Sequence, residues 1–216
     1  MFIGHFAAGF ALKRAAPRVS LVTLCAAAQW PDIVWPVLVA AGVERVAIAP
    51  GDTAFTPLAF LSYPWSHSLL LVILWAAAFA LVYFFRARDG RAAALLGGLV
   101  VSHWLLDYIT HRPDLPIYPG GPHHGLGLWN SIPATLAVEG GIFALGVWLY
   151  VRSTRPRHGR RQYGLMAFVT VLLLGYTANL SSVPPSVSAI WIGAIAGFAV
   201  LFALAAWADR ARQPIG

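Results

Sequence analysis

The sequence predicts an all-α integral membrane protein with about six transmembrane helices and a short N-terminal helix inserted only halfway. Of its 216 residues, 59% are hydrophobic and 11% are charged. The mean hydropathy is +0.70, and this composition is typical of membrane proteins rather than soluble ones. Several apolar segments also approach the length of about 20 residues that a bilayer requires. We therefore expect residues 1–216 to form a single polytopic membrane domain.

Each expected element can be placed along the chain. The apolar segments run over 19–43, 66–85, 92–110, 131–151, 163–180 and 186–207. Residues 1–12 are too short to cross and are expected to form the half-inserted helix. Strand patterns are negligible. The segment 111–130 is rich in proline and glycine and is expected to form an ordered lid on the outer face.

Basic residues gather at the ends of these segments. The net charge is +7, and thirteen of the fifteen lysines and arginines fall into four clusters. The clusters are Lys13, Arg14 and Arg18; Arg86, Arg88 and Arg91; Arg152, Arg155, Arg157, Arg160 and Arg161; and Arg210 and Arg212. Threading the segments alternately places all four clusters on one face, which the positive-inside rule makes cytoplasmic. This pattern favours a bacterial inner (plasma) membrane protein with a cytoplasmic C-terminus, and it argues against nucleic acid as a partner.

The first apolar segment is interrupted by proline beside an acid. Pro31 and Pro36 flank Asp32. Proline removes a backbone donor and kinks a helix, and inside a membrane the freed carbonyl groups must face protein or a water-filled cavity. We therefore expect a broken helix next to Asp32.

Ionisable side chains lie inside segments that otherwise suit a bilayer. Placing such a group in hydrocarbon costs about 3 kcal/mol or more, so it persists where it is paired, faces a polar cavity or holds a cation. At a rise of about 1.5 Å per residue, these groups lie roughly 18 to 28 Å from the cytoplasmic end. They are Asp32, His67, His103, Asp107 and Glu139. The shared depth predicts a polar site in the outer half of the bundle.

His103 and Asp107 have the spacing of a metal-binding helix face. Residues i and i+4 lie one turn apart, so their nitrogen and oxygen atoms can reach one ion or two neighbouring ions. His111 continues the same stripe at the mouth of the helix. Histidine and carboxylate together are a zinc ligand set. We expect one or two divalent ions, with Zn²⁺ favoured, held by His67, His103, Asp107 and Asp32.

These residues also have structural interpretations. His103 and Asp107 could form a hydrogen-bonded pair within one helix. Asp32 could cap the backbone broken by proline. His67 could start a helix for which Ser66 is the N-cap.

Two further residues have an open role. Glu139 could be a ligand or general base, or a neutral acid bonded to another helix. His5 could be a ligand or general base, but it lies lower, about 12 Å from Lys13 by helical rise, and joins the site only if the N-terminal helix tilts inward. The remaining histidines are expected to be solvated; they are His123, His124 and His158.

Short motifs in the first half of the chain resemble a known family. They are, in order, Gly4-His5-Phe6-Ala7-Ala8-Gly9, Pro31-Asp32, Ser66-His67-Ser68 and Ser102-His103-Trp104-Leu105-Leu106-Asp107. Over roughly residues 1–115 the chain resembles the YdjM-like family of membrane-bound metal-dependent hydrolases. The resemblance implies that the metal ligands are His5, Asp32, His67, His103 and Asp107. Family members tend to carry a second acid where this chain has Val34 and another histidine where it has Ser62.

A fainter resemblance is to zinc-dependent phospholipase C and the P1-type nucleases. Those helical enzymes take their ligands in a similar order, and the order here is His5, Asp32, His67, His103 with Asp107, His111 and Glu139. Their later His-x-x-x-Glu motif is absent, because Thr135 precedes Glu139 by four residues.

Two functions from different classes follow from this polar site. The first is a metal-dependent hydrolase that opens to the outer face and cleaves a phosphoester or acyl bond of a lipid or lipid-linked substrate. The second is an ion- or proton-coupled transporter or channel that uses the same acids and histidines as a pathway. A structural metal site is a third interpretation. The expected partners are the bilayer and an amphiphilic substrate.

Overall fold

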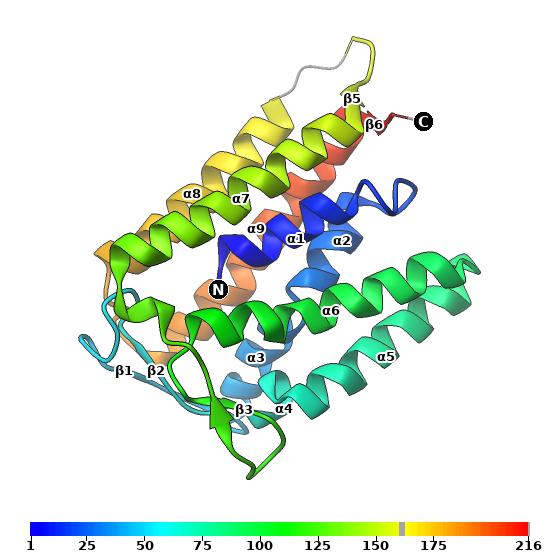
Figure 1. Cartoon of the computed structure of the whole chain (residues 1–216). Coiled ribbons are helices and arrows are strands. Elements are labelled where there is room, and N and C mark those ends of the chain that lie inside the picture. Colours follow the sequence, from blue (N-terminus) through cyan, green and yellow to red (C-terminus); the bar gives the residue numbers. More distant parts are fainter. Residues whose placement is uncertain (160–162, 216) are drawn as a thin grey trace.

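The protein is a bundle of helices, described here from a computed structural model that covers residues 1–159 and 163–215 (Figure 1). Among these residues, five helices are long and apolar enough to cross a membrane, or six if one bent pair counts as a single span. The five are α5 (Leu69–Ala87), α6 (Gly90–Thr110), α7 (Ile132–Ser153), α8 (Tyr163–Ser181) and α9 (Val187–Ala211). The fold class expected from the sequence is therefore confirmed. Arg160 and Arg161 of the third basic cluster lie outside the described residues.

Shorter elements complete the fold. The shorter helices are α1 (Ile3–Leu12), α2 (Leu21–Ala28), α3 (Trp30–Ala40), α4 (Pro64–His67) and the 3₁₀ helix η1 (Leu128–Asn130). The strands are β1 (Arg45–Ile48), β2 (Leu58–Ser62), β3 (Leu115–Pro116), β4 (His123–His124), β5 (Thr154–Pro156) and β6 (Arg212–Pro214).

The first apolar segment forms two helices, as Pro31 predicts, whereas Pro36, which was also expected to interrupt it, lies inside α3. Helices α2 and α3 meet at Gln29 with a bend of 60°. The break precedes Pro31, which lies in the first turn of α3, where the missing N–H of proline has no intrahelical partner to lose. Asp32 shares that first turn. The break therefore places an acid and the free end of a helix at the same point.

Helix α1 runs inside the bundle and is too short to cross it. Ile3, Phe6 and Phe10 are buried, and the helix packs against α7, α2 and α6. A Cβ atom built on Gly146 of α7 would lie only 2.5 Å from the carbonyl oxygen of Ala7. Glycine at this position therefore lets α1 and α7 approach backbone to backbone. Figure 1 shows the N-terminus between α7 and α6, in the middle of the bundle.

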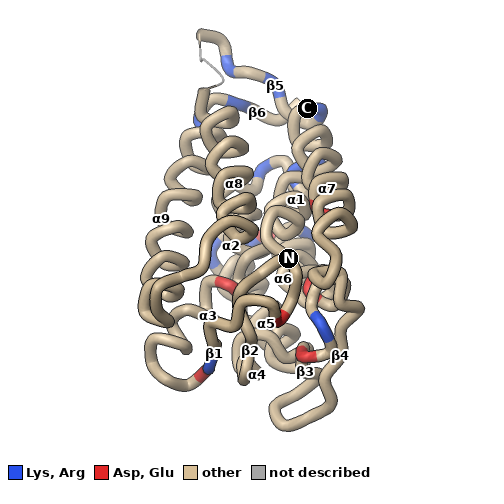
Figure 2. Tube along the Cα trace, turned by 90° about the vertical axis from the view of Figure 1, so that its left-hand side faces the viewer, with Lys and Arg blue, Asp and Glu red and all other residues tan. Residues whose placement is uncertain are grey.

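The two ends of the bundle differ in structure and charge. Strands β1 to β4 cover one end, and β5 and β6 lie at the other (Figure 1). Lysines and arginines gather around β5, β6 and the C-terminus in Figure 2. The sequence-based expectation of negligible strand structure was wrong for 45–62, where β1 and β2 pair antiparallel with Val46 opposite Phe60. The two strands pair with each other and pack against the bundle core. Each strand is too short to show an alternating apolar pattern in the sequence.

The outer helices present apolar side chains outward. In α5 only Val72 and Ala76 are buried, whereas Leu74, Leu81 and Phe85 are exposed. A continuous exposed apolar face of this kind is typical of contact with lipid. The helices therefore indicate an integral membrane protein in contact with a bilayer.

Candidate metal centre

Helices from across the first half of the chain bring their ionisable residues together. His5 comes from α1, Asp32 from α3, His67 from α4, and His103 and Asp107 from α6. All except Asp32 are buried, and Asp32 is half-buried. His5 was expected to join the site only if the N-terminal helix tilted inward, and α1 does lie inside the bundle. Four of the five residues that the sequence singled out by depth thus meet, together with His5, and the fifth, Glu139, is described below.

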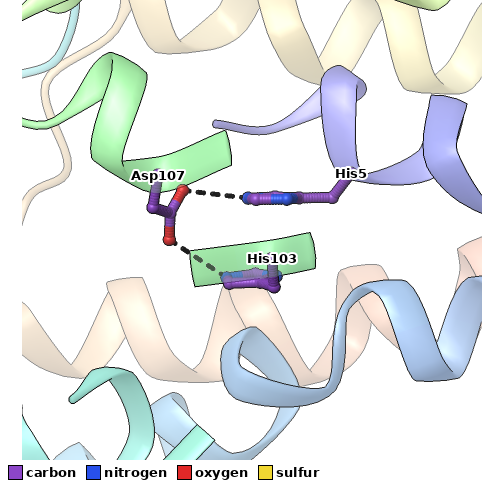
Figure 3. Close-up of side chains that lie close together, drawn as sticks. All are labelled: His5, His103 and Asp107. Atoms are coloured by element: carbon purple, nitrogen blue, oxygen red, sulfur yellow. Dashed lines mark hydrogen bonds and ion pairs between the residues drawn. The ribbon is translucent and has the colours of Figure 1, made fainter. Parts of the chain in front are cut away.

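Asp107 is at the centre of the first group. Its Oδ1 atom lies 3.0 Å from Nε2 of His5, and its Oδ2 atom lies 3.1 Å from Nε2 of His103. Figure 3 shows the carboxylate facing both imidazoles, which stack with ring centroids 3.6 Å apart. The i,i+4 pair expected from the sequence therefore exists, but it is not isolated, because His5 from another helix joins it.

Asp32 and His67 form a second group that shares His103. Nε2 of His67 lies 3.3 Å from Oδ1 of Asp32 and 3.7 Å from Oδ2 of Asp107. Nε2 of His103 lies 3.8 Å from the same Asp32 oxygen. In each group, one ligand atom from every residue lies within 4.8 Å of the others, which is close enough to surround one ion.

His67 and His103 each form a hydrogen bond at Nδ1, the ring nitrogen that does not face the aspartates. Nδ1 of His103 donates to the carbonyl oxygen of Ala28, at 2.8 Å. Nδ1 of His67 lies 2.7 Å from Oγ of Ser66, whose hydroxyl donates to Glu44, also at 2.7 Å. Glu44 additionally accepts the backbone N–H groups of Trp65 and Ser66. Outer hydrogen bonds of this type fix the ring orientation and tautomer of metal-binding histidines.

The anchors determine which ring nitrogen can bind an ion. A carbonyl oxygen only accepts, so Nδ1 of His103 carries a proton and the neutral ring presents a lone pair at Nε2. That lone pair faces the Asp107 carboxylate, and Nε2 has no hydrogen-bond partner among the described residues. Two acceptors about 3 Å apart repel unless a proton or a metal cation lies between them. The arrangement is therefore suited to a cation.

His111 lies at the edge of this cluster with an anchor of its own. Its Nδ1 donates to Asp114 at 3.0 Å, and its Nε2 lies 4.0 Å from Oδ1 of Asp107. Tyr63 and Arg112 also donate to Asp114. Burial alone would raise the pKa of the Asp114 carboxyl, but the hydrogen bond and charge of His111, with those of Tyr63 and Arg112, hold it below its usual range. His111 is thus aimed at the cluster but belongs to neither compact group.

Glu139 and the N-terminal residues adjoin the cluster from the side of α7. Glu139 is fully buried and accepts the backbone N–H of Phe2 at 3.0 Å. Its Oε1 atom has no hydrogen-bond partner among residues 1–159 and 163–215. The amino group of Met1 forms an ion pair with Oδ1 of Asp107. Glu139 therefore lies beside the N-terminal residues that contact Asp107, and one of its oxygens has no hydrogen-bond partner in the described part of the chain.

The other expected histidines lie elsewhere. His123 and His124 are exposed on β4, and His158 is exposed in the loop after β5. The expected lid contains this short β3–β4 ribbon, and it is tied to the helices by a bond from the Leu126 N–H to the Tyr108 carbonyl. Ser66 does not cap a helix; Ser68 caps α5, and Ser66 supports His67 instead.

Sequence reasoning missed the residues that anchor the histidines. Glu44, Tyr63 and Asp114 lie in loops, outside any apolar helix, so the cost of burying charge in lipid did not single them out. The i,i+3 spacing of His111 and Asp114 is the one local signal that pointed to such a pair.

No family model, curated protein or solved structure matches this chain.

The Ser66 anchor leads to a direct test. We expect Ser66→Ala to weaken divalent-metal affinity by about 10- to 100-fold, because His67 loses its outer hydrogen bond and its link to Glu44. Metal affinity can be measured by competition with a chelating dye. The matched control is Ser68→Ala, which removes a helix N-cap worth about 1 kcal/mol and should lower stability without changing affinity. Equal affinity in both variants would show that the anchor does not serve metal binding.

Proposed function

We propose that the protein is a membrane-embedded metal-dependent hydrolase acting on a phosphoester or acyl bond of a lipid or lipid-linked substrate. One observation carries the proposal: His67 and His103 are anchored at Nδ1 and direct Nε2 toward Asp32 and Asp107. If these residues only formed a pair within one helix or capped a helix end, they would not have to converge in this way. Buried charge that serves neither chemistry nor binding is costly in a membrane.

The residues present fit a divalent ion of the zinc class. His103 is common to both compact groups and would bind through Nε2. Asp107 and His5 would complete the shell on one side, and Asp32 and His67 on the other. A single nitrogen binds one ion, so one ion beside His103 is the simplest occupancy. Two ions would require Asp107 to divide its oxygens between them. When bound, such an ion polarises the scissile group and lowers the pKa of a coordinated water to about 7.

The chain's own residues supply the proton acceptor. Glu139 has a buried oxygen without a hydrogen-bond partner among the described residues, so we assign it the role of general base. Water adds to the phosphorus or carbonyl carbon, its proton passes to Glu139, and the ester oxygen leaves with a proton returned to it. His5 is the alternative base only where it is not a ligand, because its Nδ1 is also without a partner in the described chain and a neutral ring has a single acceptor nitrogen. His111, oriented by Asp114, would stabilise charge at the edge of the site.

An amphiphilic substrate suits the surroundings of the cluster. The groups lie within helices whose outer faces are apolar, beneath the end of the bundle that carries β1 to β4. If the basic clusters mark the cytoplasm, this end faces outward in an inner membrane, and the C-terminus is cytoplasmic. A lipid-linked ester could then approach from the outer leaflet. We assign contact with its headgroup to His123 and His124, which are exposed on the β3–β4 ribbon.

The relationship to the YdjM-like family is part of this proposal. It is supported by the convergence of residues from all four motifs, since His5, Asp32, His67, His103 and Asp107 adjoin one another. Sequence order alone would not require the motifs to meet.

The test is hydrolysis by purified, zinc-loaded protein in lipid nanodiscs. We expect turnover of at least one member of a panel of phospholipids, lipid-linked phosphoesters and acyl esters, and none after removal of metal. A metal-loaded protein that cleaves no substrate but conducts Zn²⁺ or protons in proteoliposomes would replace this proposal with the transporter.

A further inference from the structure

A second polar site lies at the opposite end of the bundle from β1 to β4. A groove of about 450 Å³ lies between the ends of α1 and α7. Its lining includes Lys13 and Arg14 after α1, and Trp148, Leu149 and Arg152 on the last turns of α7. Ile215, near the C-terminus, closes one side. The groove thus has a cationic part and an apolar part.

The cationic part carries charge that the protein does not neutralise. Lys13 is committed to the fold, because its Nζ donates to the carbonyl of Val19 at 2.7 Å and to Asp209 at 3.1 Å. Arg14 and Arg152 are exposed, and neither forms an ion pair with an acid among the described residues. The Arg152 guanidinium lies over the Trp148 ring, 5.5 Å from its centroid. Two guanidinium groups are therefore free to bind an anion.

The apolar part of the groove faces outward, where the lipid would lie. Trp148 is 52% exposed and Ile215 is 50% exposed, and Leu145, one turn along α7, continues the same outward surface. Tryptophan and arginine at the end of a membrane-length helix are typical of the headgroup region. A free phosphate ion would use only the arginines, whereas a phospholipid would use the arginines and the apolar wall together.

We propose that this groove binds the headgroup of an anionic phospholipid. Arg14 and Arg152 contact the phosphate through charge-assisted hydrogen bonds, and an acyl chain lies along Trp148 and Leu145. Basic pockets beside transmembrane helices bind anionic headgroups in the same way. This site is separate from the histidine–aspartate cluster and does not depend on the hydrolase proposal.

The test is native mass spectrometry of the detergent-solubilised protein titrated with phosphatidylglycerol or phosphatidylcholine. We expect phosphatidylglycerol to bind at least about tenfold more tightly, because its headgroup carries the net negative charge that the two arginines attract. The double variant R14Q/R152Q should lose that preference. Trp148→Ala should weaken phosphatidylglycerol binding and leave any binding of inorganic phosphate unchanged.

The matched control is R86Q/R91Q, which removes the same charge from another basic cluster of the bundle and should keep the preference. Equal loss in the control would mean general attraction between a basic surface and an acidic lipid, and would overturn the site. Displacement of the lipid by millimolar inorganic phosphate would assign the groove to free phosphate instead.

Discussion

Replacement of Asp107 by asparagine should lower hydrolysis by roughly three orders of magnitude, which corresponds to several kcal/mol of lost transition-state stabilisation. Asp107 is the only described residue that contacts both His5 and His103 with its two oxygens. The amide keeps the shape of the side chain but loses the negative charge that a divalent ion requires. The measurement is kcat/KM on the substrate found in the hydrolysis panel, together with thermal unfolding and metal content.

Asp89→Asn is the matched control for this variant. Asp89 is the N-cap of α6, and asparagine caps a helix about as well as aspartate. The control should keep both folding and activity. Full activity in Asp107→Asn, with metal still bound, would remove Asp107 from the mechanism and with it the proposed site.

Substitution of His103 by alanine should remove most of the bound metal. His103 belongs to both compact groups, so its loss leaves each of them one ligand short. Elemental analysis should find about one zinc ion per wild-type chain, and at least tenfold less in the variant. Because a bound ion stabilises the folded state by mass action, metal removal should also lower the melting temperature of the wild type but not of the variant.

His158→Ala is the control for metal content, since His158 is exposed in a loop far from the cluster in sequence. It should retain the wild-type amount of zinc. Equal zinc in the two variants would place the metal elsewhere. In sealed, right-side-out vesicles an impermeant chelator added outside should strip the wild type, because the cluster lies toward the proposed outer face.

The helices of this protein could be predicted from the sequence to within a few residues. The spans expected at 92–110 and 131–151 are observed at Gly90–Thr110 and Ile132–Ser153. The bilayer sets both length and polarity, so a simple count of apolar residues suffices. The β1–β2 hairpin was missed because pairing between Val46 and Phe60 depends on contacts made after folding.

The inner part of the candidate site was predictable for the same reason. A charged side chain in an apolar helix is conspicuous, and the i,i+4 spacing of His103 and Asp107 places both on one face. The anchoring residues were not conspicuous. Glu44 lies 22 residues before Ser66 in the chain, and only the folded structure brings its carboxylate beneath His67.

The break at Gln29 has a consequence for how sequences of this kind can diverge. The carbonyl of Ala28 ends α2, where helix carbonyls lose their intrahelical partners, and it accepts the hydrogen bond from His103. Every amino acid carries a backbone carbonyl, so this anchor survives any exchange at position 28 that fits the space. The anchors made by Ser66 and Asp114 depend on their side chains. Natural selection can therefore act on those two residues. The hydrogen bond that supports His103 depends instead on the bend between α2 and α3, and not on a particular side chain.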